Sequence, residues 1–222
     1  MTVILNTKDF EAVIFDMDGL LLDSEPCWQK AEQLVFKDLG FKLTHEMCLQ
    51  TTGMPVPDVI KYWYERFPWP NFDLQQTEAT LQQKAYEVIM EEAKLMPYLR
   101  ETLQFFKKKG LKIGLASASV LPLIEGVLDK FDLRDYFDTY HSAALELKSK
   151  PDPAVYLTVA SRLGVAIKNT LILEDSGTGV KGAKASGAKV IAVPAAFEYE
   201  DPKFDLADIK IPHLGELSPL FD

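Results

Sequence analysis

The sequence predicts an α/β protein with a parallel sheet, and three observations support this. Apolar segments of strand length alternate with amphipathic segments of helix length along most of the chain. These strand segments are apolar on both faces, which is typical of parallel strands covered by helices. Between Leu22 and about Leu95, helical periodicity continues without a convincing strand, which indicates a separate helical insertion.

Four segments have the composition of buried strands, and a fifth is weaker. The four are Ala12–Phe15, Lys112–Ala116, Thr170–Leu173 and Lys189–Val193, and the weaker one is Thr139–Ser142. The helical patterns between them are Tyr98–Lys109, Leu121–Phe131, Ala154–Leu163 and Thr178–Ser186. Gly110, Gly164 and Gly187 follow three of these patterns, where glycine commonly ends a helix.

The insertion contains three helical patterns, Trp28–Leu39, Val56–Phe67 and Leu74–Lys94. We therefore expect a core domain of residues 1–21 and 96–222 and a small all-helical cap domain of residues 22–95. Ligands of open parallel sheets bind at the carboxyl ends of the strands, and the insertion leaves the core at that edge. A cap in this place is expected to close over the site.

Composition excludes several classes of partner. The 222 residues are 47% hydrophobic and 26% charged, as in an ordinary globular protein, and the net charge of −9 argues against nucleic acid and anionic membranes. The chain shows neither a signal-peptide pattern nor an apolar run of the ~20 residues that a membrane span needs, so we expect a cytoplasmic protein. Cys27 and Cys48 lack metal-ligand spacing and are expected to be free thiols.

Two carboxylates end the first predicted strand. Asp16 and Asp18 follow Ala-Val-Ile-Phe and precede Gly19, which permits a turn there. Since strand side chains alternate, the two acids can lie close together where the chain turns, and they would repel each other without a cation or a shared proton. The pattern indicates Mg²⁺ chemistry with one carboxylate as nucleophile and the other as acid and base. The alternative is a strand followed by an Asx-rich turn.

Three further strand ends carry groups suited to phosphate chemistry. Their residues are Ser117, Ala118 and Ser119, then Lys150 in the stretch Ser-Lys-Pro-Asp-Pro, and then Glu174 with Asp175. The serines can hold a phosphate or cap a helix, the lysine can balance phosphoryl charge or lie in solvent, and the acids can share a cation or form a polar edge. Gly177, Gly179 and Gly182 also match a dinucleotide-binding pattern. Because acids precede these glycines directly, we expect tight helix–sheet packing instead, with nucleotide binding as the alternative.

With these motifs in place, the chain resembles the phosphatases of the haloacid dehalogenase superfamily over essentially its whole length. That resemblance implies a Rossmann-like parallel-sheet core and an α-helical cap like that of β-phosphoglucomutase and many sugar phosphatases. The stretches Phe-Asp-Met-Asp-Gly-Leu-Leu-Leu-Asp-Ser-Glu-Pro and Gly-Leu-Ala-Ser-Ala-Ser are similar to the type that acts on 2-deoxyglucose 6-phosphate and hexitol phosphates.

The resemblance implies a role for each motif residue. Asp16 would attack phosphorus to form an aspartyl-phosphate, and Asp18 would protonate the leaving oxygen and then activate water. Lys150 would orient Asp16. The phosphate would be held by Ser117 and Ala118, with Ser119 beside them, and Mg²⁺ by Asp16, the Asp18 carbonyl and Asp175, with Glu174 assisting directly or through water.

The expected substrate is a small phosphorylated sugar or sugar alcohol of the hexose 6-phosphate type, and the protein is expected to be a monomer. The alternative is a phosphotransferase like β-phosphoglucomutase. Two departures from the mutase pattern favour the phosphatase: Gly53–Asp58 contains no basic residue, and Trp28 stands where the mutase has a histidine. The sugar is expected to meet Trp28 and Met54, and also Asp23 and Glu25 unless these two cap the first cap helix.

Overall fold

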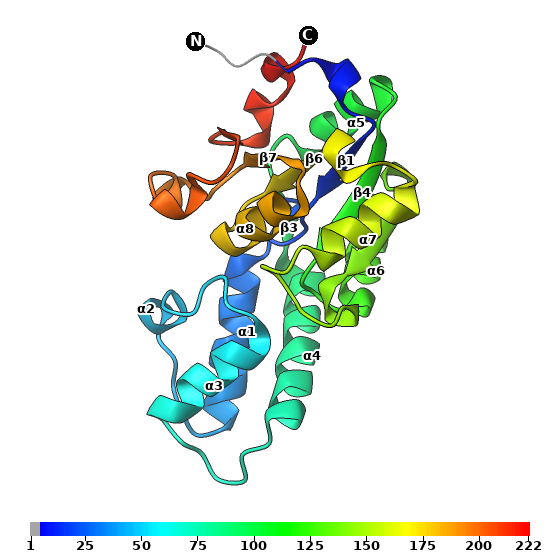
Figure 1. Cartoon of the computed structure of the whole chain (residues 1–222). Helices are drawn as coiled ribbons and strands as arrows, with labels where there is room; N and C mark the ends of the chain where they lie inside the picture. Colours follow the sequence, from blue (N-terminus) through cyan, green and yellow to red (C-terminus); the bar gives the residue numbers. More distant parts are fainter. Residues whose placement is uncertain (1–4) are drawn as a thin grey trace. The chain divides into compact units, whose positions relative to one another are not determined.

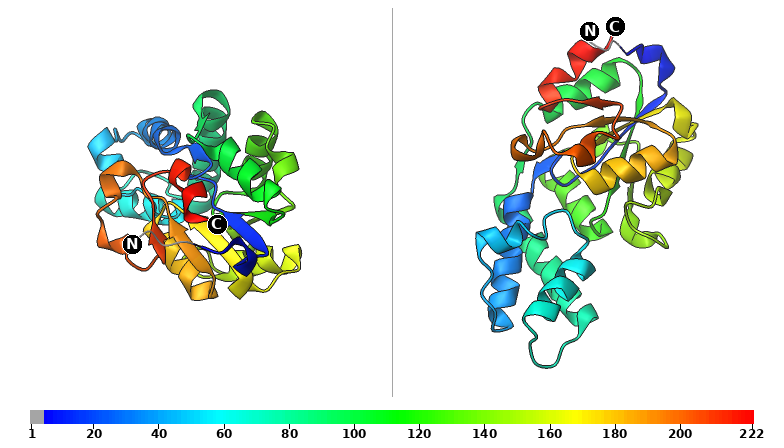
Figure 2. Two further views of the ribbon diagram at one scale, coloured as in Figure 1. Left: turned by 90° about the horizontal axis from the view of Figure 1, so that it is seen from above. Right: turned by 60° about the vertical axis from the view of Figure 1, so that its left-hand side comes forward.

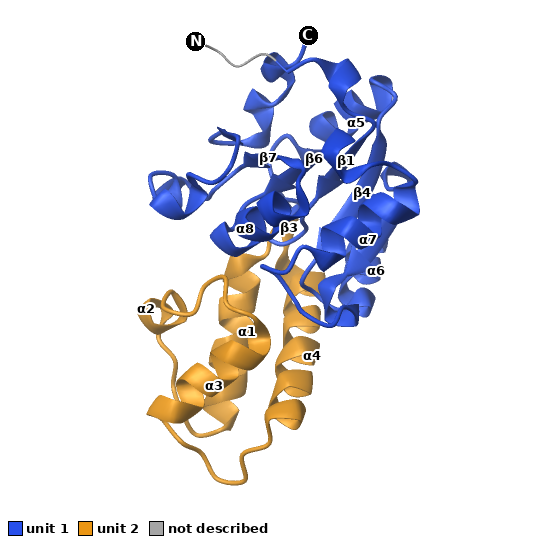
Figure 3. Ribbon diagram, in the orientation of Figure 1, with its two compact units in different colours: residues 1–22, 95–222 blue, residues 23–94 orange. Residues whose placement is uncertain are grey.

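The structure, a computed structural model, describes residues 5–222, which form two compact units (Figure 3). The core unit comprises the residues up to Leu22 together with Leu95–Asp222, and the helical unit comprises Asp23–Lys94. Two short strands, β2 (Leu22–Asp23) and β3 (Lys94–Leu95), pair with each other where the chain passes between the units.

The core unit contains a six-stranded parallel sheet with the strand order β5-β4-β1-β6-β7-β8 (Figure 1). The strands are β1 (Ala12–Phe15), β4 (Lys112–Ser117), β5 (Thr139–Ser142), β6 (Thr170–Glu174), β7 (Lys189–Ala192) and β8 (Ile209–Lys210). The predicted α/β fold with a parallel sheet is confirmed. Strand β8 was not predicted, because two residues are too few to show a strand pattern.

Helices cover both faces of this sheet (Figure 2). They are α5 (Leu99–Lys108), α6 (Leu121–Lys130), α7 (Ala154–Leu163) and α8 (Gly177–Ser186). Because successive strand residues point to opposite faces, Ile14 joins the buried cluster that includes Val159 of α7 and Val180 of α8. Phe15, on the other face, meets Phe106 of α5 edge to face at 6.0 Å. The strands are therefore apolar on both sides, as the sequence indicated.

The parallel register brings four strand ends to one edge of the sheet. Phe15 lies opposite Leu115 of β4 and Leu173 of β6, and Ser117 lies opposite Ser142 of β5. Residues that directly follow these positions must therefore emerge close together, although they are far apart in the sequence.

The helical unit is built on α1 (Glu25–Asp38), α2 (His45–Cys48), α3 (Val56–Arg66) and α4 (Leu74–Glu92). Its core includes Trp63 and Trp69, and Phe36 meets Trp69 edge to face at 5.6 Å. Cys27 and Cys48 are buried free thiols, as expected. Among residues 5–222, no helix combines the length and apolar content needed to cross a membrane.

Glu32 is an unusual component of this helical core. It is buried on α1, and its Oε2 atom has no hydrogen-bond partner. Burial, together with the charge of Glu25, raises the pKa of Glu32 to about 8. The side chain is therefore neutral in the folded protein at pH values where it is ionised in the unfolded chain.

Glu32→Gln should flatten the dependence of stability on pH. Between about pH 4.5 and 8 the folded state keeps a proton at Glu32 that the unfolded state releases, so stability falls as pH rises through this window. Glutamine does not titrate, and the variant should be more stable than the wild type at pH 8 by about 1–3 kcal/mol. Urea unfolding without divalent cations at pH 5, 6.5 and 8 measures the difference.

Glu65→Gln is the matched control, because Glu65 is exposed on α3 of the same unit. Parallel stability curves for wild type and Glu32→Gln across this pH range would contradict the assignment.

Candidate active site

Asp16 directly follows β1, and its backbone continues the sheet. The Asp16 amide donates to the carbonyl of Leu173 at 3.1 Å, which ties the residue to β6. Beyond it the chain turns at Gly19, whose φ is +75°, and the Gly19 amide donates to the Leu22 carbonyl at 2.8 Å. Asp16 is buried at the base of this turn, and Asp18 is half-buried within it.

The ammonium of Lys150 joins three strands. Its Nζ lies 2.5 Å from Asp16 Oδ1, 2.7 Å from Glu174 Oε1 and 3.0 Å from the carbonyl oxygen of Ala116. A lysine has three N–H donors, so this set uses all of them. The side chain is 7% exposed, and the alternative of a solvated surface lysine is wrong.

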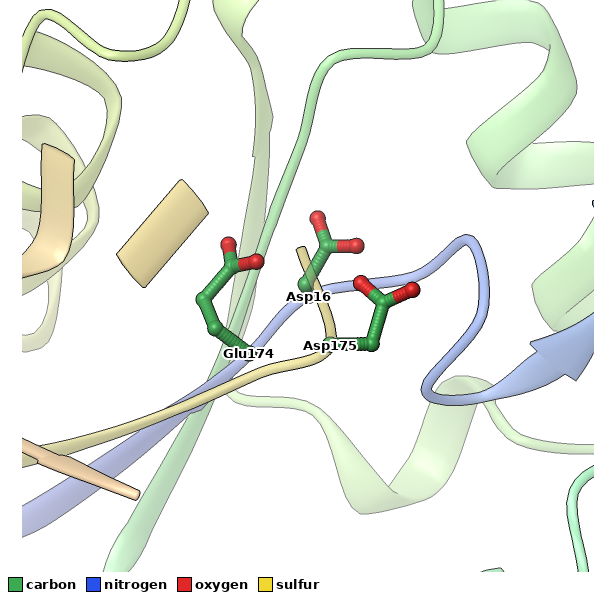
Figure 4. Close-up of side chains that lie close together, drawn as sticks. All are labelled: Asp16, Glu174 and Asp175. Atoms are coloured by element: carbon green, nitrogen blue, oxygen red, sulfur yellow. The ribbon is translucent and has the colours of Figure 1, made fainter. Parts of the chain in front are cut away.

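Three carboxyl groups lie close together at this edge of the sheet (Figure 4). Asp16, Glu174 and Asp175 each present an oxygen within 4.8 Å of the others. The carboxyl of Asp18 is not part of this group. The arrangement brings the ends of β1 and β6 together, as the sequence predicted for two acidic strand ends in one sheet.

The site gathers charged groups in a space shielded from water, and this burial shifts their pKa values. Burial raises the pKa of Asp16 to about 8, with Lys150 lowering it and Glu174 and Asp18 raising it. Burial, Asp16 and Glu174 hold the pKa of Asp175 well above its ordinary value. Burial alone would lower the pKa of Lys150, but Asp16 and Glu174 hold it well above the usual range. One cation thus faces three acids in a buried space.

Two glycines make room for the acids. A Cβ on Gly19 would lie 1.9 Å from Asp175 Oδ2, and one on Gly179 would lie 1.9 Å from Glu174 Oε2. The glycine at 179 is therefore needed because the Glu174 carboxyl lies against the first turn of α8. A carboxylate in that place would repel a pyrophosphate, which argues against the dinucleotide alternative and agrees with the expected close packing.

The segment after β4 is held by serine side chains. Ser119 Oγ donates to Asp18 Oδ2 at 2.7 Å, and the Ser119 amide donates to Ser117 Oγ at 3.0 Å. Ser142 Oγ donates to the Ser119 carbonyl at 2.6 Å. Neither predicted serine caps α6, since the residue at its N-cap is Val120. Ala118 is exposed between the two buried serines.

Two residues of this network were missed in the sequence. Ser142 ends the weak strand β5, and its place at a strand end was the available signal. Tyr156 lies in the apolar face of α7, and its hydroxyl oxygen is 2.5 Å from Glu174 Oε1. The apolar pattern of this helix face does not indicate that its tyrosine hydroxyl forms a hydrogen bond to a site residue.

The remaining candidates belong to the helical unit. Glu25 Oε1 accepts hydrogen bonds from Gln29 Nε2 at 2.9 Å and from Thr52 Oγ1 at 2.8 Å, while the N-cap of α1 is Ser24. Trp28 is half-buried, and Met54 is exposed. Their contacts with a sugar, like that of Asp23, stay predictions.

Comparison with known proteins agrees with this geometry. The family model described as haloacid dehalogenase-like hydrolase matches residues 13–193. The chain is 43% identical to hexitol phosphatase B of Escherichia coli strain K12 over 93% of its own length and 94% of the relative's. It is 33% identical to a phosphorylated carbohydrates phosphatase of Thermotoga maritima, covering 82% and 83% of the two chains.

A solved structure, that of a putative beta-phosphoglucomutase from Thermotoga maritima, is also similar. The two share 29% identity and a TM-score of 0.77, with 95% of this chain and 99% of that one covered. The match of the family model to most of the sequence, together with the relatives' identities, establishes that the chain belongs to the haloacid dehalogenase-like hydrolases.

Proposed function

We propose that this protein is a Mg²⁺-dependent phosphatase that hydrolyses a small sugar or sugar-alcohol phosphate through an aspartyl-phosphate on Asp16. The observation that carries the proposal is the buried pair of Lys150 and Asp16 within a cluster of three carboxyl groups. The names of the two relatives, hexitol phosphatase B and phosphorylated carbohydrates phosphatase, support the substrate class and point to a hexose 6-phosphate or hexitol phosphate.

The donor set fits Mg²⁺. Three carboxyl groups within 4.8 Å provide only oxygen ligands, which this ion prefers, and their excess negative charge is balanced by a divalent cation. Asp16 and Asp175 would hold the ion together with the backbone carbonyl of Asp18. When bound, Mg²⁺ offsets negative charge on the phosphoryl oxygens and on Asp16.

Lys150 prepares Asp16 for the first step. Because Lys150 donates to Oδ1, the carboxyl group has a fixed orientation and its ionised form is favoured. An Asp16 carboxylate oxygen forms a bond to phosphorus while the bond from phosphorus to the sugar oxygen breaks. Asp18 gives its proton to that leaving oxygen, and the free sugar departs.

The second step regenerates the enzyme. Asp18, now a carboxylate, takes a proton from a water molecule as the water oxygen attacks phosphorus, and the bond between phosphorus and Asp16 breaks. Ser119 fits both steps, because its hydroxyl can donate to ionised Asp18 and accept from protonated Asp18. One acid thus serves in both directions without leaving its partner.

Phosphate oxygens are assigned to the segment after β4. Ser117 Oγ accepts from the Ser119 amide and keeps its own hydrogen for a phosphate oxygen. The backbone amide of Ala118 is the second proposed donor. The charge that spreads over three phosphoryl oxygens in transfer reactions needs such fixed donors.

Phosphate release should require both Mg²⁺ and a phosphorylated sugar. We expect rapid release from a hexitol phosphate or a hexose 6-phosphate, and little from nucleotides, in a panel measured with Mg²⁺ and with chelator. β-Glucose 1-phosphate tests the mutase alternative, which the similarity to the putative beta-phosphoglucomutase keeps relevant. Conversion of that compound to its 6-phosphate without phosphate release would replace the phosphatase with a phosphotransferase.

Removing either aspartate should stop turnover. Asp16→Asn removes the nucleophile and should lower kcat by at least about a thousandfold, and Asp18→Asn removes the proton carrier and should lower it about a hundredfold or more. Asp205→Asn, an exposed acid of the same unit, is the matched control and should keep wild-type kcat. An Asp16→Asn enzyme with near wild-type kcat would rule out the aspartyl-phosphate route.

A further inference from the structure

Glu146 belongs to a largely buried polar cluster that the proposed reaction does not use. It lies in the segment 143–149, which connects β5 to Lys150. Its Oε1 atom lies 2.8 Å from Nε2 of His141 on β5 and accepts from the Thr158 hydroxyl of α7 at 2.7 Å. The side chains of His141 and Glu146 are 6% and 19% exposed. One carboxylate oxygen therefore joins this segment to a strand and to a helix of the core unit.

The hydrogen bond between Glu146 and His141 fixes both side chains. The Thr158 hydroxyl, and then His141, hold the pKa of Glu146 below its ordinary value although burial raises it, so the carboxylate is ionised and can only accept. We therefore assign the ring hydrogen to Nε2. The other ring nitrogen, Nδ1, is buried without a hydrogen-bond partner. Loss of Glu146 would leave both nitrogens of a buried ring unsatisfied, which is unfavourable.

Apolar packing does not hold the middle of the segment 143–149. Leu145 and Leu147, on either side of Glu146, are 60% and 104% exposed. The start of the segment is tied to β5, because the Ala144 amide donates to Ser142 Oγ at 3.1 Å. Beyond that point the Glu146 side chain supplies the contacts with β5 and α7.

This contact lies close to the place where Lys150 is held. His141 is opposite Ala116 in the parallel register of β4 and β5, and the Ala116 carbonyl accepts from Lys150 Nζ at 3.0 Å. Glu146 precedes Lys150 by four residues in the chain. Anchoring so short a stretch at Glu146 reduces the number of conformations that the backbone of Lys150 can adopt.

We propose that Glu146 is a positioning residue whose hydrogen bonds with His141 and Thr158 hold the segment 143–149 in place and thereby keep Lys150 on Asp16. The expected effect on turnover rests on the proposed function, in which Lys150 orients the Asp16 nucleophile. The effect on the position of Lys150 does not depend on any activity.

Glu146→Ala should slow turnover without weakening substrate binding. We expect kcat to fall about tenfold while KM stays within about twofold, because the positioning of Asp16 is affected and the proposed phosphate donors after β4 are not. Glu146→Gln keeps a carbonyl oxygen that can accept from both donors, so its kcat should stay within about threefold of the wild type. Glu101→Ala, which removes an exposed glutamate of α5, is the matched control and should keep wild-type kcat.

Acetylation by acetic anhydride, followed by mass spectrometry, reports the position of Lys150 in the Mg²⁺-free protein. The Lys150 side chain is 7% exposed and should react slowly, whereas Lys181 is exposed on α8 and should react quickly. In Glu146→Ala we expect Lys150 to react at least about fivefold faster, and Lys181 at a rate within about twofold of the wild type. Glu146→Gln should protect Lys150 as the wild type does. Urea unfolding of each variant verifies that it is folded under the labelling conditions.

Three results would overturn the proposal. They are an unchanged labelling rate of Lys150 in Glu146→Ala, a wild-type kcat for that variant, and a Glu146→Gln protein that matches Glu146→Ala in both measurements. If the wild type released no phosphate from any sugar phosphate, the proposed function would fail. The labelling rates would then still decide whether Glu146 holds Lys150 in place.

Discussion

Lys150 holds the charge balance on which the rest of the site depends. Its ammonium contacts residues at the ends of β1, β4 and β6, and it lies beside a cluster of three acids, of which Asp16 and Glu174 are buried and Asp175 is half-buried. Burial raises the pKa values of Asp16 and Asp175, and the charge of Lys150 acts in the opposite direction on both, so the lysine favours their ionised forms. The parallel register of β1, β4 and β6 brings the three groups that this lysine contacts to one edge of the sheet.

The parallel sheet aligns the carboxyl ends of its strands. Neighbouring strands end at matching positions, so Asp16, Ser117 and Glu174 emerge at one edge although long stretches of sequence separate them. Close backbone approach then completes the site, because Gly19 and Gly179 leave the space that the carboxyl groups of Asp175 and Glu174 occupy. A side chain at either glycine would overlap an acid. The positions of the acids therefore depend on two glycines that take no part in the reaction themselves.

Much of the core could be predicted from sequence because its signals are local. An apolar run such as Ala12–Phe15 identifies a buried strand, and the polar residue after it identifies the site-facing end. Other features depend on tertiary contacts. Ser142 and Tyr156 become part of the network only when β5 pairs with β4 and α7 packs against the sheet. The buried Glu32 interrupts a helix face that a pattern would fill with apolar residues. Ser117 and Ser119 were predicted as site residues. Their hydrogen bonds, from the Ser119 hydroxyl to Asp18 and from the Ser119 amide to Ser117, were not predicted.

The aspartyl-phosphate mechanism is tested most directly by mass spectrometry of the enzyme quenched in acid during its first turnover of a hexitol phosphate with Mg²⁺. We expect a phosphoryl group on the peptide that contains Asp16, appearing before free phosphate reaches one equivalent and absent when Mg²⁺ is chelated. Release of a full equivalent of phosphate with the Asp16 peptide unmodified at every time point would contradict it, because water would then attack the substrate directly.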